Sequence, residues 1–102
     1  MPLLPALFPD IEGFQWDEGN SSKTWIRHRV AQAEAEQVFL NRPVLVTAAH
    51  TRAETRHLVL GQTDEGRLLA VIFTIRGRLL RVISARPMSR RERQTYDQAL
   101  RQ

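Results

Sequence analysis

The sequence of 102 residues contains no cysteine, a single lysine and no long apolar run. The absence of cysteine excludes disulfide frameworks, thiolate catalysis and cysteine-bound zinc. No stretch approaches the roughly 20 apolar residues that a membrane-spanning helix needs. The short apolar run at residues 1–8 contains two prolines and no basic leader, which is not typical of a signal peptide. We therefore expect a cytoplasmic protein without membrane contacts.

The composition is that of a globular protein with one core. Hydrophobic residues make up 42% of the chain and charged residues 25%, values that place it apart from disordered and membrane proteins. Residues 1–10 contain three prolines and no periodic pattern. We therefore predict a lead-in over residues 1–13 and a single domain over residues 14–102.

The positive charge is concentrated in the second half of the chain. Residues 1–51 contain four basic and six acidic residues, whereas residues 52–102 contain eleven arginines and five acidic residues. Arginine suits phosphate because its planar guanidinium donates two parallel hydrogen bonds and stacks on bases. The clustered arginines predict a polyanion or an acidic protein as partner.

Two helices are predicted in the first half. Asp17 is expected to cap the first helix, with Trp25 and Ile26 on its buried side. Apolar residues at helical spacing predict a second helix over residues 31–41. This helix should end before Pro43, because a residue that precedes proline is disfavoured in the helical region.

The second half has the pattern of a sheet followed by a helix. Apolar runs between turn residues predict strands over residues 44–47, 57–61, 68–75 and 79–85, in addition to a short edge strand over residues 11–16. Residues 50–54 are expected to form a polar connection. Ser89 and Glu92 form an S-x-x-E capping box, which predicts a final helix over residues 90–100 with Tyr96 in the core. The resulting order β-α-α-β-β-β-β-α predicts an α+β fold with two N-terminal helices, a mainly antiparallel sheet and a C-terminal helix.

Motifs along residues 14–97 resemble those of the BrnT family of bacterial type II toxins. The first half is similar to the family series F-x-W-D, K-H-G-V and E-V-F-x-D, with FQWDE at 14–18, RHRV at 27–30 and EQVFLN at 36–41. The second half is closer still, with ISAR at 83–86 followed by RRER at 90–93 and Tyr96. The combination of ISAR and RRER is specific, whereas F-x-W-D alone is a weak signal.

The resemblance implies a RelE-like fold and a ribonuclease that stops translation. It further implies inhibition by a BrnA-like antitoxin, an RNA substrate that is free or on the ribosome, and DNA contact only through the antitoxin. Four positions depart from the family pattern: Asn20 and Arg27 replace lysines, Thr24 replaces an asparagine, and Arg29 replaces a glycine. An arginine at position 29 would be strained if the backbone there has a positive φ.

A metal-independent ribonuclease needs cations around the scissile phosphate and groups that accept and donate a proton. Arg56, Arg81 and Arg86 are the candidates for the cations, because they lie on the predicted sheet and match family positions. The structural alternative is that an arginine pairs with Glu54 or Glu92. Arg81 in particular needs a partner, because it lies among apolar residues where an unpaired charge is costly.

His50 and Glu54 complete the predicted catalytic set. Histidine is the usual acid or base near neutral pH, and we favour His50 over His28 because loops often carry reactive groups. Glu54 could orient His50, act as the base or hold Arg56. RNA binding is predicted for a wider set: His28, Arg67, Arg76, Arg90 and Arg91. No pattern such as H-E-x-x-H, an EF-hand or a P-loop indicates a metal or nucleotide cofactor.

Two readings of function are open at this stage. In the first, the chain is a ribonuclease toxin, and the set of Arg56, Arg81 and Arg86 favours this reading. In the second, it is a catalytically degenerate binding module that engages an antitoxin or nucleic acid without cleavage, which the departures at Asn20 and Arg29 favour. A DNA-binding protein is disfavoured because no helix-turn-helix motif is present.

Overall fold

The computed structural model describes residues 10–101. Along the chain, the helices and strands are β1 (Gly13–Gln15), α1 (Glu18–His28), α2 (Gln32–Val38), β2 (Val44–His50), β3 (Thr55–Gln62), β4 (Leu68–Arg76), β5 (Leu79–Pro87) and α3 (Arg90–Leu100). Among the described residues, no helix has the length and apolar composition needed to cross a membrane.

The strands form one five-stranded sheet in the order β1-β5-β4-β3-β2. Strand β1 runs parallel to β5, and the other neighbours are antiparallel. The α+β class and the antiparallel meander are therefore confirmed. The strands β2 and β3 are longer than predicted, because cross-strand pairing continues as far as His50 and Thr55 and shortens the polar connection.

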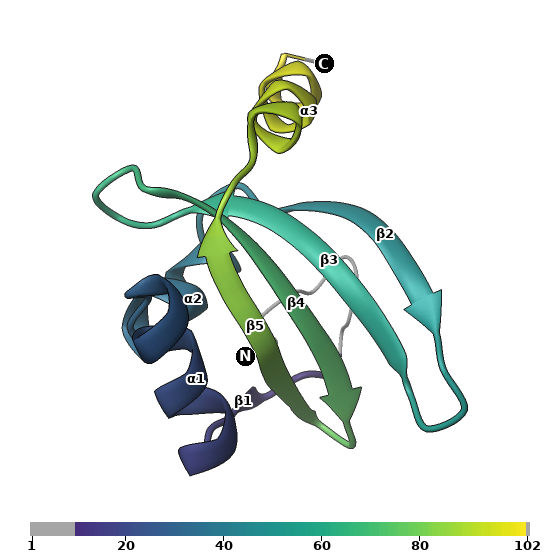
Figure 1. The fold of residues 1–102 in the computed structure, drawn as a ribbon. Coiled ribbons are helices and arrows are strands. Elements are labelled where there is room, and N and C mark those ends of the chain that lie inside the picture. The colour runs from purple at the N-terminus through teal and green to yellow at the C-terminus, as the bar shows by residue number, and fades with distance from the viewer. Residues whose placement is uncertain (1–9, 102) are drawn as a thin grey trace.

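The two faces of the sheet have different coverings (Figure 1). Helices α1 and α2 lie together on one side, which we call the covered face, and α3 stands at one end of the sheet. The core of the covered face joins α2 to the central strands, and Phe39 packs edge-on against Phe73 with ring centroids 5.1 Å apart. On the opposite face, Tyr96 and Met88 pack on Leu60 and Ala70, so α3 covers only that end. The buried position of Tyr96 confirms its predicted role.

Helix α1 begins as predicted but is oriented differently. The Asp17 carboxylate accepts hydrogen bonds from the backbone amides of Gly19 and Asn20, and so caps the helix. The prediction that Trp25 and Ile26 are buried is wrong: they are 48% and 71% exposed. The helix instead buries polar residues, because the Asn20 amide donates to the carbonyls of Gln15 and Val82 at the sheet edge.

Both helix ends in the first half carry an arginine with a positive φ. Arg29 follows α1 with a φ of 53°, which confirms the strain expected from arginine in place of glycine. Helix α2 ends at Val38, earlier than the predicted residue 41, because the amides of residues 39–41 bond in turns to the carbonyls of Glu36 and Gln37. Arg42, which follows these turns, has a φ of 52°.

Two residues of the predicted lead-in, Ile11 and Glu12, contact the folded domain. Ile11 is 2% exposed and belongs to the core of the covered face, and the Glu12 amide donates to the Arg78 carbonyl. The packed chain therefore includes Ile11, while residues 1–9 of the predicted lead-in lie outside the described residues.

Candidate active site

Arg56 and Arg81 lie on the same face of the sheet, opposite to the covered face. Arg81 pairs directly with Thr74, and Arg56 precedes His57, whose partner on β4 is Phe73. In this antiparallel register Arg56 lies opposite Thr74, one position beyond the pair of His57 and Phe73. Because residues that lie opposite each other share a face, Arg56 and Arg81 are on the same face, on either side of Thr74. We call this surface the open face, because within residues 10–101 only α3 covers part of it.

A shallow hollow of about 250 Å³ lies beside Arg56. Its lining consists of Thr47, Ala49, Arg56, His57, Leu58 and Ile72. Leu58 and Ile72 give it a largely apolar floor next to one guanidinium. Such a surface suits a ligand with a flat apolar part and a negative charge.

Arg56 is the most loosely held of the three predicted catalytic arginines. Its side chain is 48% exposed, and its nearest carboxylate oxygen, Glu54 Oε1, lies 3.9 Å away. The other carboxylate oxygen of Glu54 is buried and lacks a hydrogen-bond partner among the described residues. The open face thus combines an available guanidinium with a carboxylate that is only partly satisfied.

Arg81 has the partner that its apolar neighbours require. Its two terminal nitrogens donate to the two oxygens of Asp17 at 2.8 and 3.2 Å, and its side chain is 16% exposed. This hydrogen bonding lowers the pKa of Asp17. A guanidinium has five donor N–H groups, so Arg81 keeps donors for an anion while it stays paired.

Arg86 is tied to the start of α3. Its terminal nitrogens donate to both oxygens of Glu92 at 2.6 and 3.0 Å. The hydrogen bonds from Arg86 lower the pKa of Glu92 to about 2, and the same pair raises the pKa of Arg86. Arg86 pairs with Ala70, in the part of the sheet that α3 covers. Its ion pair with Glu92 therefore favours a structural role for Arg86 over contact with a phosphate.

The structure does not direct the imidazoles of His50 and His57 to the open face, although His57 contributes to the lining of the hollow beside Arg56. His50 pairs with Thr55 and Ala49 pairs with Arg56, so alternation directs His50 and Arg56 to opposite faces. His50 Nδ1 lies 2.9 Å from Thr55 Oγ1. His57 stacks on the Phe73 ring of the covered face, and burial, followed by the nearby charge of His50, lowers its pKa. Of the catalytic residues predicted from the sequence, Arg56 and Arg81 share one row of the sheet, and Glu54 lies beside Arg56.

The predicted RNA-binding residues are spread over the molecule. Arg67 donates to Glu34 and to the carbonyls of His28 and Arg29, which fixes it between α1 and α2. His28 is half-buried at the end of α1. Arg76 is exposed where β4 ends, and the exposed Arg90 and Arg91 begin α3, at two different places in the fold.

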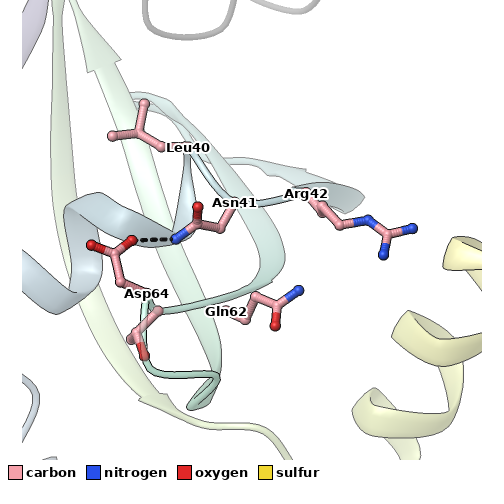
Figure 2. Close-up of a pocket in the computed structure, with 6 residues that line it drawn as sticks. Leu40, Asn41, Arg42, Gln62 and Asp64 are labelled. Atoms are coloured by element: carbon pink, nitrogen blue, oxygen red, sulfur yellow. Dashed lines mark hydrogen bonds between the residues drawn. The ribbon is translucent and has the colours of Figure 1, made fainter.

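A second hollow, of about 360 Å³, lies where β3 ends (Figure 2). It is formed by residues 40–42 after α2, by Gln62 at the end of β3 and by the two residues that follow it. Asn41 donates to Asp64 at 2.8 Å across it. None of the predicted site residues lines this hollow.

Sequence reasoning missed the groups that complete the open face. Thr74 is buried between the two arginines and donates to the Thr55 carbonyl, while Ser84 pairs with Ile72 on the same face. Strand alternation could have found these residues, but no local signal connects Asp17 with Arg81. Within the described range, no group of three His, Asp or Glu side chains is arranged to hold a metal ion.

The fold and the open face define a small α+β domain that presents a carboxylate and arginines on one side of a sheet, a class of site suited to an anionic substrate. Residues 16–92 match the family described as the ribonuclease toxin BrnT of type II toxin-antitoxin systems, and the chain belongs to this family. Membership implies an antitoxin partner.

The fold is similar to that of a solved family structure. The crystal structure of the Brucella abortus ribonuclease toxin BrnT matches with a TM-score of 0.56 and 25% sequence identity, over 76% of this chain and 97% of that chain. A comparison with curated proteins gave no match.

Proposed function

We propose that this chain is a metal-independent endoribonuclease toxin of the cytoplasm, which cuts RNA free or on the ribosome and so inhibits translation. The observation that carries the proposal is that Arg56, with Glu54 beside it, and Arg81 lie on one face of the sheet, on either side of Thr74. A mainly antiparallel sheet with one open face also supports the RelE-like assignment as part of this proposal.

The row suggests a division of labour during attack by a 2′-hydroxyl on the neighbouring phosphate. Arg56 would contact the phosphate oxygens, since it is exposed and weakly paired. Arg81, held rigidly by Asp17, would donate its remaining N–H groups to the charge that develops in the transition state. Glu54 would accept the proton of the 2′-hydroxyl as its oxygen bonds to phosphorus, because it is the carboxylate beside Arg56. The bond from phosphorus to the 5′-oxygen would break, and this leaving oxygen would take a proton from water. His50 and Arg86 keep supporting roles in this proposal.

Two further parts of the proposal concern partners. A BrnA-like antitoxin would neutralise the toxin by direct contact, and DNA would be bound only through that antitoxin. The His28, Arg67, Arg76, Arg90 and Arg91 side chains would contribute to RNA binding outside the row.

The test is inducible expression of the chain without antitoxin, combined with cleavage of RNA by the purified protein. The wild-type chain should arrest growth and degrade RNA. Arg56→Ala should lower the cleavage rate by about 10²–10³, the loss typical of removing one transition-state hydrogen-bond donor. Cleavage of a labelled single strand under single-turnover conditions measures this effect.

Arg52→Ala is the matched control, because Arg52 is an exposed arginine in the connection between β2 and β3, next to the row. It should cleave RNA at the wild-type rate. Equal losses in the two variants would show a diffuse charge effect. Normal growth at good expression of the wild-type chain would favour the binding module without cleavage instead.

A further inference from the structure

The outer side of α1 exposes an aromatic and an aliphatic side chain that the proposed cleavage site does not use. Trp25 is 48% exposed and Ile26 is 71% exposed, on a helix whose inner side is occupied by Asn20 and Thr24. Exposed apolar residues that lie side by side mark a binding surface more often than singly exposed ones.

Basic residues flank this apolar centre on both sides. At 100° per residue, Lys23 and Arg27 fall on one side of Ile26 and Trp25 falls on the other. Arg29, which follows the helix, lies on the Trp25 side. The Arg29 guanidinium carbon lies 5.3 Å from the centroid of the Trp25 ring. We call these five residues the α1 patch: Lys23, Trp25, Ile26, Arg27 and Arg29.

The chain around the α1 patch adds no negative charge. Residues 19–33 contain no acidic residue. The end of a helix normally carries partial negative charge on its last carbonyls. Here the carbonyls of His28 and Arg29 accept hydrogen bonds from the guanidinium of Arg67, which also pairs with Glu34, so these carbonyls are partnered at the rim of the patch.

We propose that the α1 patch is a second RNA-binding surface, in which a base stacks on Trp25 and the flanking cations contact phosphates. An aromatic ring among cations is the arrangement by which proteins hold single strands without reading their sequence. The charge favours RNA over an apolar protein segment, because the three cations of the patch attract a polyanion and would be costly to bury against an apolar partner.

The position of the α1 patch determines which RNA can reach it, an inference that rests on the proposed function. Helix α1 lies on the covered side of the sheet, whereas Arg56 lies on the open face (Figure 1). A short oligonucleotide would occupy only the open face, but a long strand could reach both surfaces. The α1 patch would therefore make the toxin prefer long RNA.

The experiment measures binding of a long and a short single-stranded RNA by fluorescence polarisation. Both RNAs carry 2′-O-methyl groups, which cannot attack the phosphate, so cleavage does not disturb the equilibrium. Trp25→Ala should weaken binding of the long RNA about tenfold, within the range expected for one lost stacked base. Binding of the short RNA should stay unchanged.

Arg29→Gly tests the charge without harming the fold, because glycine accepts the positive φ at this position. It should reduce the salt slope for the long RNA by about 0.7, the contribution of one phosphate contact on a single strand. Arg42→Gly is the matched control, since Arg42 also has a positive φ but does not belong to the α1 patch. The control should keep the wild-type slope.

Failure of this inference is distinguishable from failure of the proposed function. If no RNA is cleaved but Trp25→Ala still weakens the long RNA selectively, the α1 patch stands and the proposed enzyme does not. Equal affinities of Trp25→Ala, Arg29→Gly and the wild type for the long RNA would overturn the patch. Loss of antitoxin binding with RNA affinity intact would also overturn it and identify a protein-binding surface.

Discussion

At the residue scale, two arginines of β5 each form an ion pair with a carboxylate that also caps the N-terminus of a helix. Asp17 caps α1 and pairs with Arg81, while Glu92 belongs to the capping box of α3 and pairs with Arg86. A carboxylate is favoured at a helix N-terminus by the helix dipole, and a bidentate arginine fixes its orientation. The same residues that were predicted to hold phosphate thus also connect the sheet to two helices.

The pair of Arg86 and Glu92 should make the stability of the fold sensitive to acid. The folded-state pKa of Glu92 falls from 4.5 to about 2. A depressed folded pKa contributes stability that is complete above the unfolded pKa and is lost as the pH falls towards the folded pKa. Glu92→Gln should therefore lower the free energy of unfolding by about 2 kcal/mol at neutral pH, after a reduction for solvent screening. Urea unfolding at several pH values measures this difference.

The difference between wild type and Glu92→Gln should shrink between pH 4.5 and about 2. Asp97→Asn is the control, because Asp97 and Arg101 form an exposed ion pair within α3 and such pairs contribute little. It should leave the unfolding free energy close to that of the wild type across the same range. A pH-independent difference for Glu92→Gln would mean that capping alone, without the ion pair, explains its effect.

At the element scale, α2 approaches β3 closely because Gly61 has no side chain. A Cβ atom at this position would lie 2.7 Å from Val38 Cγ1 and 2.8 Å from the Val38 carbonyl oxygen. A side chain can rotate away from such a contact, but the backbone carbonyl at the end of α2 cannot move without shifting the helix. The packing of α2 over the covered face therefore depends on this glycine.

Gly61→Ala should destabilise the domain by about 2–3 kcal/mol, the range for overpacking a tight core. Gly13→Ala is the matched control on β1, because a Cβ atom there would meet only Leu79 Cδ2, at an ordinary 3.5 Å. Thermal unfolding should show a melting temperature lowered by about 10 °C for Gly61→Ala and little change for the control. Equal melting temperatures for the two variants would show that α2 shifts freely.

At the scale of the whole molecule, the net charge of +4 is unevenly distributed. Many arginines of the second half are paired within the fold, and the exposed cations include Arg56 on the open face, two on α1 and two at the start of α3. An antitoxin that neutralises a ribonuclease must keep RNA from its site. An acidic or amphipathic segment could do so on the open face, where opposite charge also speeds association.

We expect the antitoxin to bury the surroundings of Arg56, Arg81, Arg86 and α3 and to compete with RNA. Hydrogen exchange of the co-purified complex should show protection of β3, β5 and α3, and the complex should bind RNA more weakly than the free toxin. Protection confined to residues before Phe14, with RNA still bound, would contradict occlusion. That result would indicate that the antitoxin tethers the toxin at a distance from the site.

Local signals in the sequence determined the family, the α+β class and several helix ends. Asp17, Ser89 and Glu92 act on amides within three residues, so their capping could be predicted from neighbours alone. The strain at Arg29 was likewise predictable, because it depends on the backbone of one residue. The turn residues and apolar runs predicted the antiparallel meander.

Only the tertiary structure decided which candidates share a surface. Register directs Arg56 to the open face and His50 to the opposite one, and a shift of one residue would reverse both. The pairing of Arg81 with Asp17 spans 64 positions, and the exposure of Trp25 follows from polar contacts that Asn20 makes at the sheet edge. These features depend on contacts between distant segments, which residue type and spacing along the chain do not specify.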